Sequence, residues 1–228
     1  MALAVPDLRE RDVVHIQCHI GFDTIALARR GGRVTGVDFS RVSLDKAADL
    51  AERCGVEIDW VQADAAALPD SLRCRFDLAY ATVGAICWIE DLDAWMRCAA
   101  ATLRPGGRLV LVEIHPLYAM VEDAGEPLRL DFPYAFDGPH RFDEPGSYAD
   151  ADAPVRATAE VVYAHSLGEV VNAAIAAGLR IDALHEHLKT DLDPRGNLLT
   201  QGEDGRYRLE VSGERLPVLF TLIATRPA

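Results

Sequence analysis

The chain has 228 residues, half of them hydrophobic, and its 23 lysine and arginine residues against 36 aspartate and glutamate residues give a formal net charge of −13. A chain of this length and apolar content can bury its own core, and we expect a single domain. The charge repels a phosphate backbone or an anionic bilayer, which argues against nucleic acids and membranes as partners. Five scattered cysteines, a polar start of the chain and the absence of an apolar stretch of membrane-spanning length predict a cytoplasmic protein with reduced thiols.

Short apolar runs alternate with amphipathic helical patterns from Val13 onward, which is typical of strands joined by crossovers in a parallel sheet. The expected strands are 13–17, 34–38, 56–61, 76–81, 108–113, 179–184 and 216–225. Helices are expected over 24–30, from about 44 to a stop at Gly55, over 93–103, and from the capping box at Ser166 to Gly178. The last helix should bury Leu167, Val170, Val171, Ala174 and Ile175, and an Asp204-Gly205 turn should precede the final strand.

Residues 115–165 lack this periodicity but hold six of the twelve prolines and seven of the sixteen aromatic residues. A loop of this length in a domain is usually a lid or disordered, and the aromatic content favours a lid. We therefore expect one domain in three parts: a cofactor-binding core over 12–114, a lid that caps the substrate over 115–165, and a helix with strands over 166–228 that completes the sheet.

Several short motifs follow the expected strands in a fixed order: "QCHIG" at 17–21, "TGVDFS" ending at Ser40, "VQADA" ending at Ala65, and "LRPGGRLVLVEIHP" ending at Pro116. Together they resemble the class I S-adenosylmethionine-dependent methyltransferases, in particular a bacterial small-molecule subgroup whose first loop reads Gln-Cys-His-x-Gly. The resemblance implies an α/β fold: a Rossmann-like, seven-stranded, mostly parallel sheet with helices on both faces and an antiparallel last strand.

Ligands of open parallel sheets bind beyond the carboxyl ends of the strands, near the point where the strand order reverses. Loop 17–24 lies there at a helix N-terminus, where backbone N–H groups can meet a carboxylate. Asp38 would accept the ribose hydroxyls and Asp64 the adenine amino group; Asp64 alone would be interpreted as a turn residue, but the matched pair favours binding. The residues expected to contact S-adenosyl-L-methionine are Gln17, Cys18, His19, Gly21, Asp23, Thr24, Asp38, Phe39, Ser40, Asp64, Ala65, Ala81 and Thr82.

The first loop departs from the usual pattern, because Gln17 and His19 stand where glycines are common and His15 stands where an acid is common. Glycine serves positive φ angles and close approach, so Gln17 and His19 either point away from the cofactor or contact it themselves. His15, Cys18 and His19 are also zinc-ligand types. No second Cys/His cluster follows at a usual spacing, so we expect no metal and interpret His15 as a hydrogen-bonded core histidine.

The resemblance implies transfer of a methyl group to a small-molecule acceptor, with S-adenosyl-L-homocysteine as the product. Glu113 ends strand 108–113, and His115 and Tyr118 come after it. His115 is the candidate base, with an equal case for a residue that only orients the loop at Pro116. The candidate substrate contacts are Trp88, Tyr118, Tyr134 and Tyr148.

Three other functions stay open: another reaction of the same cofactor such as cyclisation, a non-catalytic cofactor-binding protein, and an NAD(P)-dependent oxidoreductase. The absence of Gly-x-Gly-x-x-Gly argues against the last. A homodimer is conceivable.

Overall fold

The computed structural model describes residues 5, 7–123, 128–143, 159–191, 193 and 198–228. Its centre is a seven-stranded sheet in the order β10-β14-β5-β4-β1-β2-β3. Six of these seven strands run in the same direction, and β14 runs antiparallel to the other six. The expected α/β architecture with an antiparallel last strand is confirmed. The strands are β1 (Asp12–Ile16), β2 (Arg33–Asp38), β3 (Asp59–Gln62), β4 (Phe76–Ala81), β5 (Leu103–Ile114), β10 (Arg180–His187) and β14 (Leu219–Thr225).

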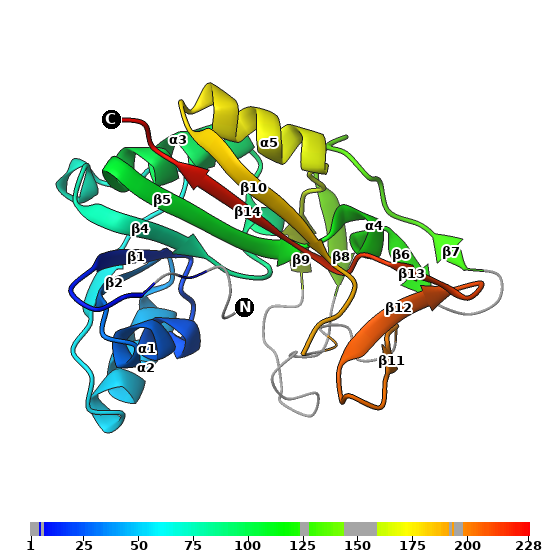
Figure 1. Cartoon of the computed structure of the whole chain (residues 1–228), viewed down its shortest axis with the longest axis horizontal. Helices are drawn as coiled ribbons and strands as arrows, with labels where there is room; N and C mark the ends of the chain where they lie inside the picture. The colour runs from blue at the N-terminus through cyan, green and yellow to red at the C-terminus, as the bar shows by residue number, and fades with distance from the viewer. Residues whose placement is uncertain (1–4, 6, 124–127, 144–158, 192, 194–197) are drawn as a thin grey trace.

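Four helices cover the two faces of this sheet, α3 and α5 on one side and α1 and α2 on the other (Figure 1). Their bounds are α1 (Phe22–Arg29), α2 (Arg41–Arg53), α3 (Leu92–Thr102) and α5 (Leu167–Ala176). Side-chain caps begin three of them: Ser40 accepts from Ser43 N, Asp91 from Ala94 N, and Ser166 forms the predicted capping box with Glu169.

Some boundaries and one buried face differ from the expectation. Strand 56–61 is shorter, because regular pairing with β2 begins only at Asp59. Strand 216–225 is divided at Pro217, which has no N–H to donate to a ladder; β13 (Glu214–Leu216) pairs with β12 (Tyr207–Val211), and β14 begins afterwards. The expected burial of Ile175 is wrong: its side chain is 57% exposed, and Ala173 takes its place in the core.

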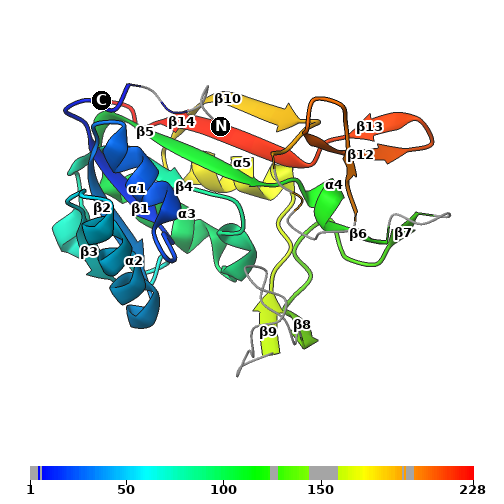
Figure 2. The same ribbon diagram turned by 90° about the horizontal axis from the view of Figure 1, so that it is seen from below.

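The segment after β5 contains more regular structure than its sequence suggests. It holds α4 (Pro116–Ala119), the paired strands β6 (Val121–Asp123) and β7 (Arg129–Leu130), and the paired strands β8 (His140–Asp143) and β9 (Ala159–Val162). Figure 2 shows the β8–β9 pair projecting away from the central sheet.

A small three-stranded sheet, β11 (Thr200–Gln201), β12 and β13, lies beside α4. It shares a separate core with Tyr118 and Val121. The expected turn before β12 is present, with Gly205 at a φ of 76° and its N–H bonded to Gly202 O. No helix within the described ranges is long and apolar enough to cross a membrane.

Candidate functional site

The carboxyl ends of β1 and β2 are joined through the carboxylate of Asp38. Its Oδ2 accepts from His19 N at 2.8 Å and its Oδ1 from Ser40 N at 2.9 Å. The backbone N–H of Cys18 also bonds to Val37 O. An ionised carboxylate has about four acceptor positions, so two bonds leave capacity on both oxygens. Asp38 is therefore fixed in place and can still accept hydroxyl donors at this edge.

The first loop keeps a glycine-like backbone although two of its positions carry side chains. Gln17, His19 and Gly21 have φ angles of 57°, 50° and 80°. A left-handed conformation costs an L-residue roughly 1–2 kcal/mol, so the loop is strained at the first two positions. A Cβ on Gly21 would lie 2.9 Å from both Ala47 Cβ and the Trp60 ring. Both the backbone and the packing explain why this position is glycine.

The two substituted loop positions differ in where their side chains go. Gln17 turns into the protein: its Nε2 donates to Ala85 O at 2.9 Å, and its Oε1 accepts from Trp95 Nε1 at 2.8 Å. His19 is exposed at the surface of the loop. Of the two alternatives for Gln17, this geometry favours the one in which the side chain points away from a ligand.

His15 is a buried, hydrogen-bonded histidine. Its Nδ1 lies 2.8 Å from Thr24 Oγ1 and its Nε2 lies 3.3 Å from Thr82 Oγ1, so it connects α1 to the end of β4. Burial lowers the pKa of His15 to about 3, and the ring is neutral at pH 7. Burial, with the nearby Asp38 charge, raises the pKa of the Cys18 thiol to about 12. No group of three metal-ligand side chains was found in the described part of the chain.

Asp64 forms a turn. Its Oδ1 accepts from Ala66 N at 2.8 Å and its carbonyl oxygen from Ala67 N at 3.0 Å. The carboxylate is exposed, so Oδ2 can still face a ligand. Phe39, immediately after β2, is 74% exposed. Gln62 Nε2 donates to Phe39 O, and this bond links the carboxyl end of β3 to that of β2.

The other expected cofactor contacts lie at the same edge of the sheet. Asp23 and Thr24 are in the first turn of α1, Ala81 is the buried last residue of β4, and Thr82 follows it. The predicted set therefore comes from the ends of β1, β2, β3 and β4, on one side of the molecule.

Residues 13–107 match the sequence model of the methyltransferase domain. This match covers less than half of the chain. A ubiquinone biosynthesis O-methyltransferase from Alkalilimnicola ehrlichii is 29% identical over 110 residues, covering 48% of this chain and 44% of the relative. Methyltransferase GfsG from Streptomyces halstedii is 36% identical over 108 residues, covering 45% of this chain and 37% of the relative. The matches span less than half the length of these relatives.

A solved structure extends the similarity of fold beyond the methyltransferase domain. An S-adenosylmethionine-dependent methyltransferase from Mesorhizobium loti superposes with a TM-score of 0.66 at 21% identity, covering 99% of this chain and 95% of that one. The likeness of fold therefore continues over residues 108–228.

Glu113, at the end of β5, holds the turn that follows β4. Its carboxylate accepts from the backbone N–H groups of Gly84, Ala85, Ile86 and Ile114 at 2.7–3.0 Å. Burial raises the pKa of Glu113, and the four N–H donors oppose that rise by favouring the carboxylate. The sequence marked Glu113 only by its place after a buried strand; this anchoring role was not predicted.

His115 lies directly beyond this anchor and caps α4. Its Nδ1 accepts from Leu117 N at 3.1 Å, so Nε2 carries the proton and donates to Glu186 Oε1 at 2.9 Å. The ring is buried edge-on against Phe220, and burial lowers the pKa of His115 despite the Glu186 charge. Both ring nitrogens are engaged, which favours the orienting role over the base.

The candidate substrate residues separate into two groups. Trp88 and Tyr134 are exposed, whereas Tyr118 is buried in the core beside the small sheet, with its hydroxyl 3.3 Å from Asp193 Oδ1. Tyr148 lies outside the described residues.

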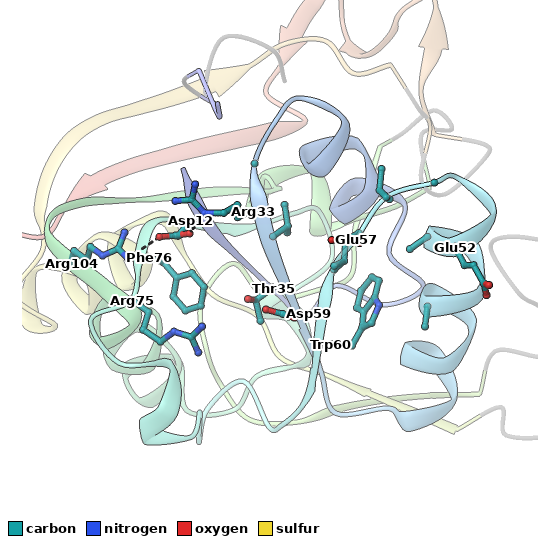
Figure 3. A pocket seen from close by; sticks show the side chains of 17 residues that line it. Asp12, Arg33, Thr35, Glu52, Glu57, Asp59, Trp60, Arg75, Phe76 and Arg104 are labelled. Atoms are coloured by element: carbon teal, nitrogen blue, oxygen red, sulfur yellow. Dashed lines mark hydrogen bonds and ion pairs between the residues drawn. The ribbon is translucent and has the colours of Figure 1, made fainter. Parts of the chain in front are cut away.

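A cavity of about 980 Å³ lies at the opposite edge of the sheet, where β1, β2, β3 and β4 begin (Figure 3). Its most prominent polar feature is the Asp12 carboxylate between Arg33 Nε at 2.7 Å and Arg104 Nη2 at 2.8 Å. These charges are paired with one another and tie strand ends together. Since ligands of open parallel sheets bind at the carboxyl ends, we place the candidate site at Asp38.

Proposed function

We propose that this protein is an S-adenosylmethionine-dependent methyltransferase that acts on a small-molecule acceptor. The observation that carries the proposal is the position of Asp38, whose carboxylate is fixed by His19 N and Ser40 N beside the N-terminus of α1. An acid at the end of the second strand is suited to ribose hydroxyls, and a helix N-terminus is suited to a carboxylate. The methyltransferase domain match over 13–107 includes all of these groups.

The described residues fit the parts of such a cofactor. Asp38 would accept the ribose hydroxyls, the exposed ring of Phe39 would pack on the adenine, and Asp64 Oδ2 would accept from its amino group. The N–H groups of loop 17–24 and α1 would meet the carboxylate of the methionine portion. When bound, the cofactor supplies an activated methyl group on a sulfonium leaving group.

The protein's contribution to catalysis would be mainly positioning. Holding the acceptor atom in line with the methyl group can be worth roughly 7–11 kcal/mol, whereas a general base adds about 10²–10⁴-fold. Glu113 and Gln17 fix the turn after β4 beside the loop that follows β1, and the segment 115–165 would cover the acceptor. His115 as the base stays a prediction.

Partner and location are part of the same proposal. The net charge of −13 supports an acceptor other than nucleic acid or membrane lipid. Five free cysteines support a reducing, cytoplasmic location. The homodimer stays a prediction that light scattering can check.

Calorimetric titration with S-adenosylhomocysteine and, separately, with NADH tests the cofactor. We expect one site for S-adenosylhomocysteine with micromolar affinity; binding of NADH alone would overturn the proposal. Incubation with S-adenosylmethionine and an acceptor should release S-adenosylhomocysteine. Release of methylthioadenosine without a methylated product would instead favour another reaction of the sulfonium.

A further inference from the structure

Aromatic side chains gather where the segment after β9 meets the short 3₁₀ turn η2 (Ile86–Trp88) behind β4. Tyr163 N donates to Cys87 O at 2.8 Å, and His165 Nε2 donates to Ile89 O at 2.7 Å. These two bonds lie on either side of Trp88 in the sequence. The lid segment is thus fastened to the turn that leads out of the candidate cofactor site.

Phe136 lies over Tyr163 and His165. Its ring centroid is 6.2 Å from that of Tyr163, with planes 15° apart, and 6.1 Å from that of His165, with planes 11° apart. Phe136 is nevertheless 42% exposed, so part of it stays accessible to solvent.

The position of Phe136 is fixed through the N-terminus of α5. Its backbone N–H donates to Glu169 Oε2 at 3.4 Å, and the same oxygen accepts from Ser166 N and Oγ at 2.7 Å. We call Phe136, Tyr163 and His165 the aromatic platform. It is tied to the capped N-terminus of α5, and Phe136 is its most exposed member.

The charges beside the aromatic platform restrict what can bind to it. The Glu169 carboxylate accepts from the Phe136 backbone N–H, and hydrogen bonds from Ser166 keep the pKa of Glu169 lowered despite partial burial. Glu160 of β9 precedes Tyr163 in the sequence, and the whole chain is strongly acidic. An anionic ligand would be repelled, whereas a flat apolar ring gains stacking and burial. The exposed indole of Trp88, at 47%, belongs to the turn to which Tyr163 and His165 are hydrogen-bonded.

We propose that the aromatic platform and Trp88 bind the methyl acceptor, and that the acceptor presents a planar aromatic ring without a negative charge. The bound ring is a methyl acceptor only if the proposed function is correct, so this assignment rests on that function. Binding of the ring itself needs no cofactor, so the two proposals can fail separately.

The test uses three small probes of similar size: catechol, its saturated counterpart cyclohexanediol, and its carboxylated counterpart dihydroxybenzoate. Binding to the full chain is measured by ligand-observed NMR and by quenching of tryptophan fluorescence. We expect catechol to bind in preference to both others. Phe136→Leu should weaken catechol binding about 3- to 10-fold, the worth of one aromatic pair. Phe136→Tyr keeps the ring and should retain binding.

Matched controls separate the platform from general effects. Ile175→Ala removes another exposed hydrophobic side chain, outside both candidate sites, and should leave catechol binding unchanged. Thermal melting identifies any variant that has lost its fold, and Trp88→Leu then replaces Phe136→Leu as the decisive variant. The proposal is wrong if catechol and cyclohexanediol bind equally well. It is also wrong if Phe136→Leu and Trp88→Leu bind catechol with the same affinity as the parent chain. Failure to bind S-adenosylhomocysteine would overturn the proposed function and leave the ring assay interpretable.

Discussion

The indole Nε1 of Trp95 donates a hydrogen bond to Gln17 Oε1 at 2.8 Å, which joins α3 to the loop after β1. The same amide donates from Nε2 to Ala85 O, so one side chain connects three segments around the candidate site. Trp95 is completely buried and has no access to water for its N–H. The side chain of Gln17 therefore holds the three segments together, and its two hydrogen bonds offset the strain of its φ angle of 57°.

Removing the Gln17 side chain should destabilise the fold. Gln17→Ala leaves a buried indole donor unsatisfied and should lower the free energy of unfolding by about 2–3 kcal/mol. Gln17→Gly loses the same bonds but relieves the left-handed strain, so its loss should be about 1 kcal/mol smaller. Urea denaturation of both variants measures the difference. A glycine variant less stable than the alanine variant would show that the backbone is not strained there.

Gly21→Ala should be more harmful than an alanine placed at an uncrowded glycine. The new Cβ would meet Ala47 and Trp60 at 2.9 Å in a backbone with a φ of 80°. Strain and overpacking together should cost about 2–4 kcal/mol. Gly55→Ala is the matched control, because its φ is also positive and nothing lies within 4 Å of the new Cβ. It should cost about 1 kcal/mol, and equal losses in the two variants would refute the crowding.

The sequence predicts a helix or strand well where apolar residues recur with the period of that element. The central strands and helices were predicted because long apolar runs and caps such as Ser166 define them. The strands β6 to β9, two to four residues long, are too short to show an alternation. The residue types of Gln17 and His19 do not indicate their positive φ angles; only the resemblance to loops with glycine at these positions pointed to them. Ile175 fits a helical face, but only the neighbouring elements decide which side is buried.

The candidate site shows the same division. Asp38 and the first loop were predicted to meet because strand ends of a parallel sheet share one edge, and they do. The role of Glu113 was not predictable, since its four donors are backbone groups that carry no sequence signature. The aromatic platform likewise joins side chains about thirty residues apart in a segment without periodicity.

Asp38→Asn should weaken binding of S-adenosylhomocysteine. The amide keeps one acceptor oxygen but turns its NH₂ toward a backbone N–H of His19 or Ser40 and removes the charge that ribose hydroxyls would meet. The dissociation constant should rise about 10- to 100-fold, the worth of hydrogen bonds to a charged group. Calorimetry measures it, and Asp64→Asn, at an exposed turn, should have the smaller effect. The reverse order would move the ribose site away from β2.

The buried His15 should make stability depend on pH in a defined window. Its pKa is lowered to about 3 in the folded state, so the unfolded chain binds the proton first as the pH falls below its ordinary value of about 6.5. Stability is then complete above pH 7 and is lost toward acid, by about 2 kcal/mol between pH 7 and pH 5. Carboxylates with lowered pKa values contribute only at lower pH.

His15→Gln isolates this contribution from the other histidines whose pKa is lowered, His115 and His187. Its urea-derived stability should be lower at pH 7 and should change less between pH 7 and pH 5 than that of the parent chain. Parallel pH profiles for the two proteins would mean that His15 takes up its proton without unfolding.

His115→Asn distinguishes a loop-orienting residue from a general base. Asparagine can still accept from Leu117 N and cap α4, but it cannot take a proton from an acceptor. Because Nδ1 is occupied by Leu117 and Nε2–H by Glu186, we expect the rate of S-adenosylhomocysteine formation to stay within about 3-fold, well short of the loss expected for a missing base. His115→Ala, which removes the cap, should instead lower the free energy of unfolding by about 1–2 kcal/mol. A fall of about 10²-fold or more in the folded asparagine variant, with loss of the acidic limb of the pH profile, would establish His115 as the base.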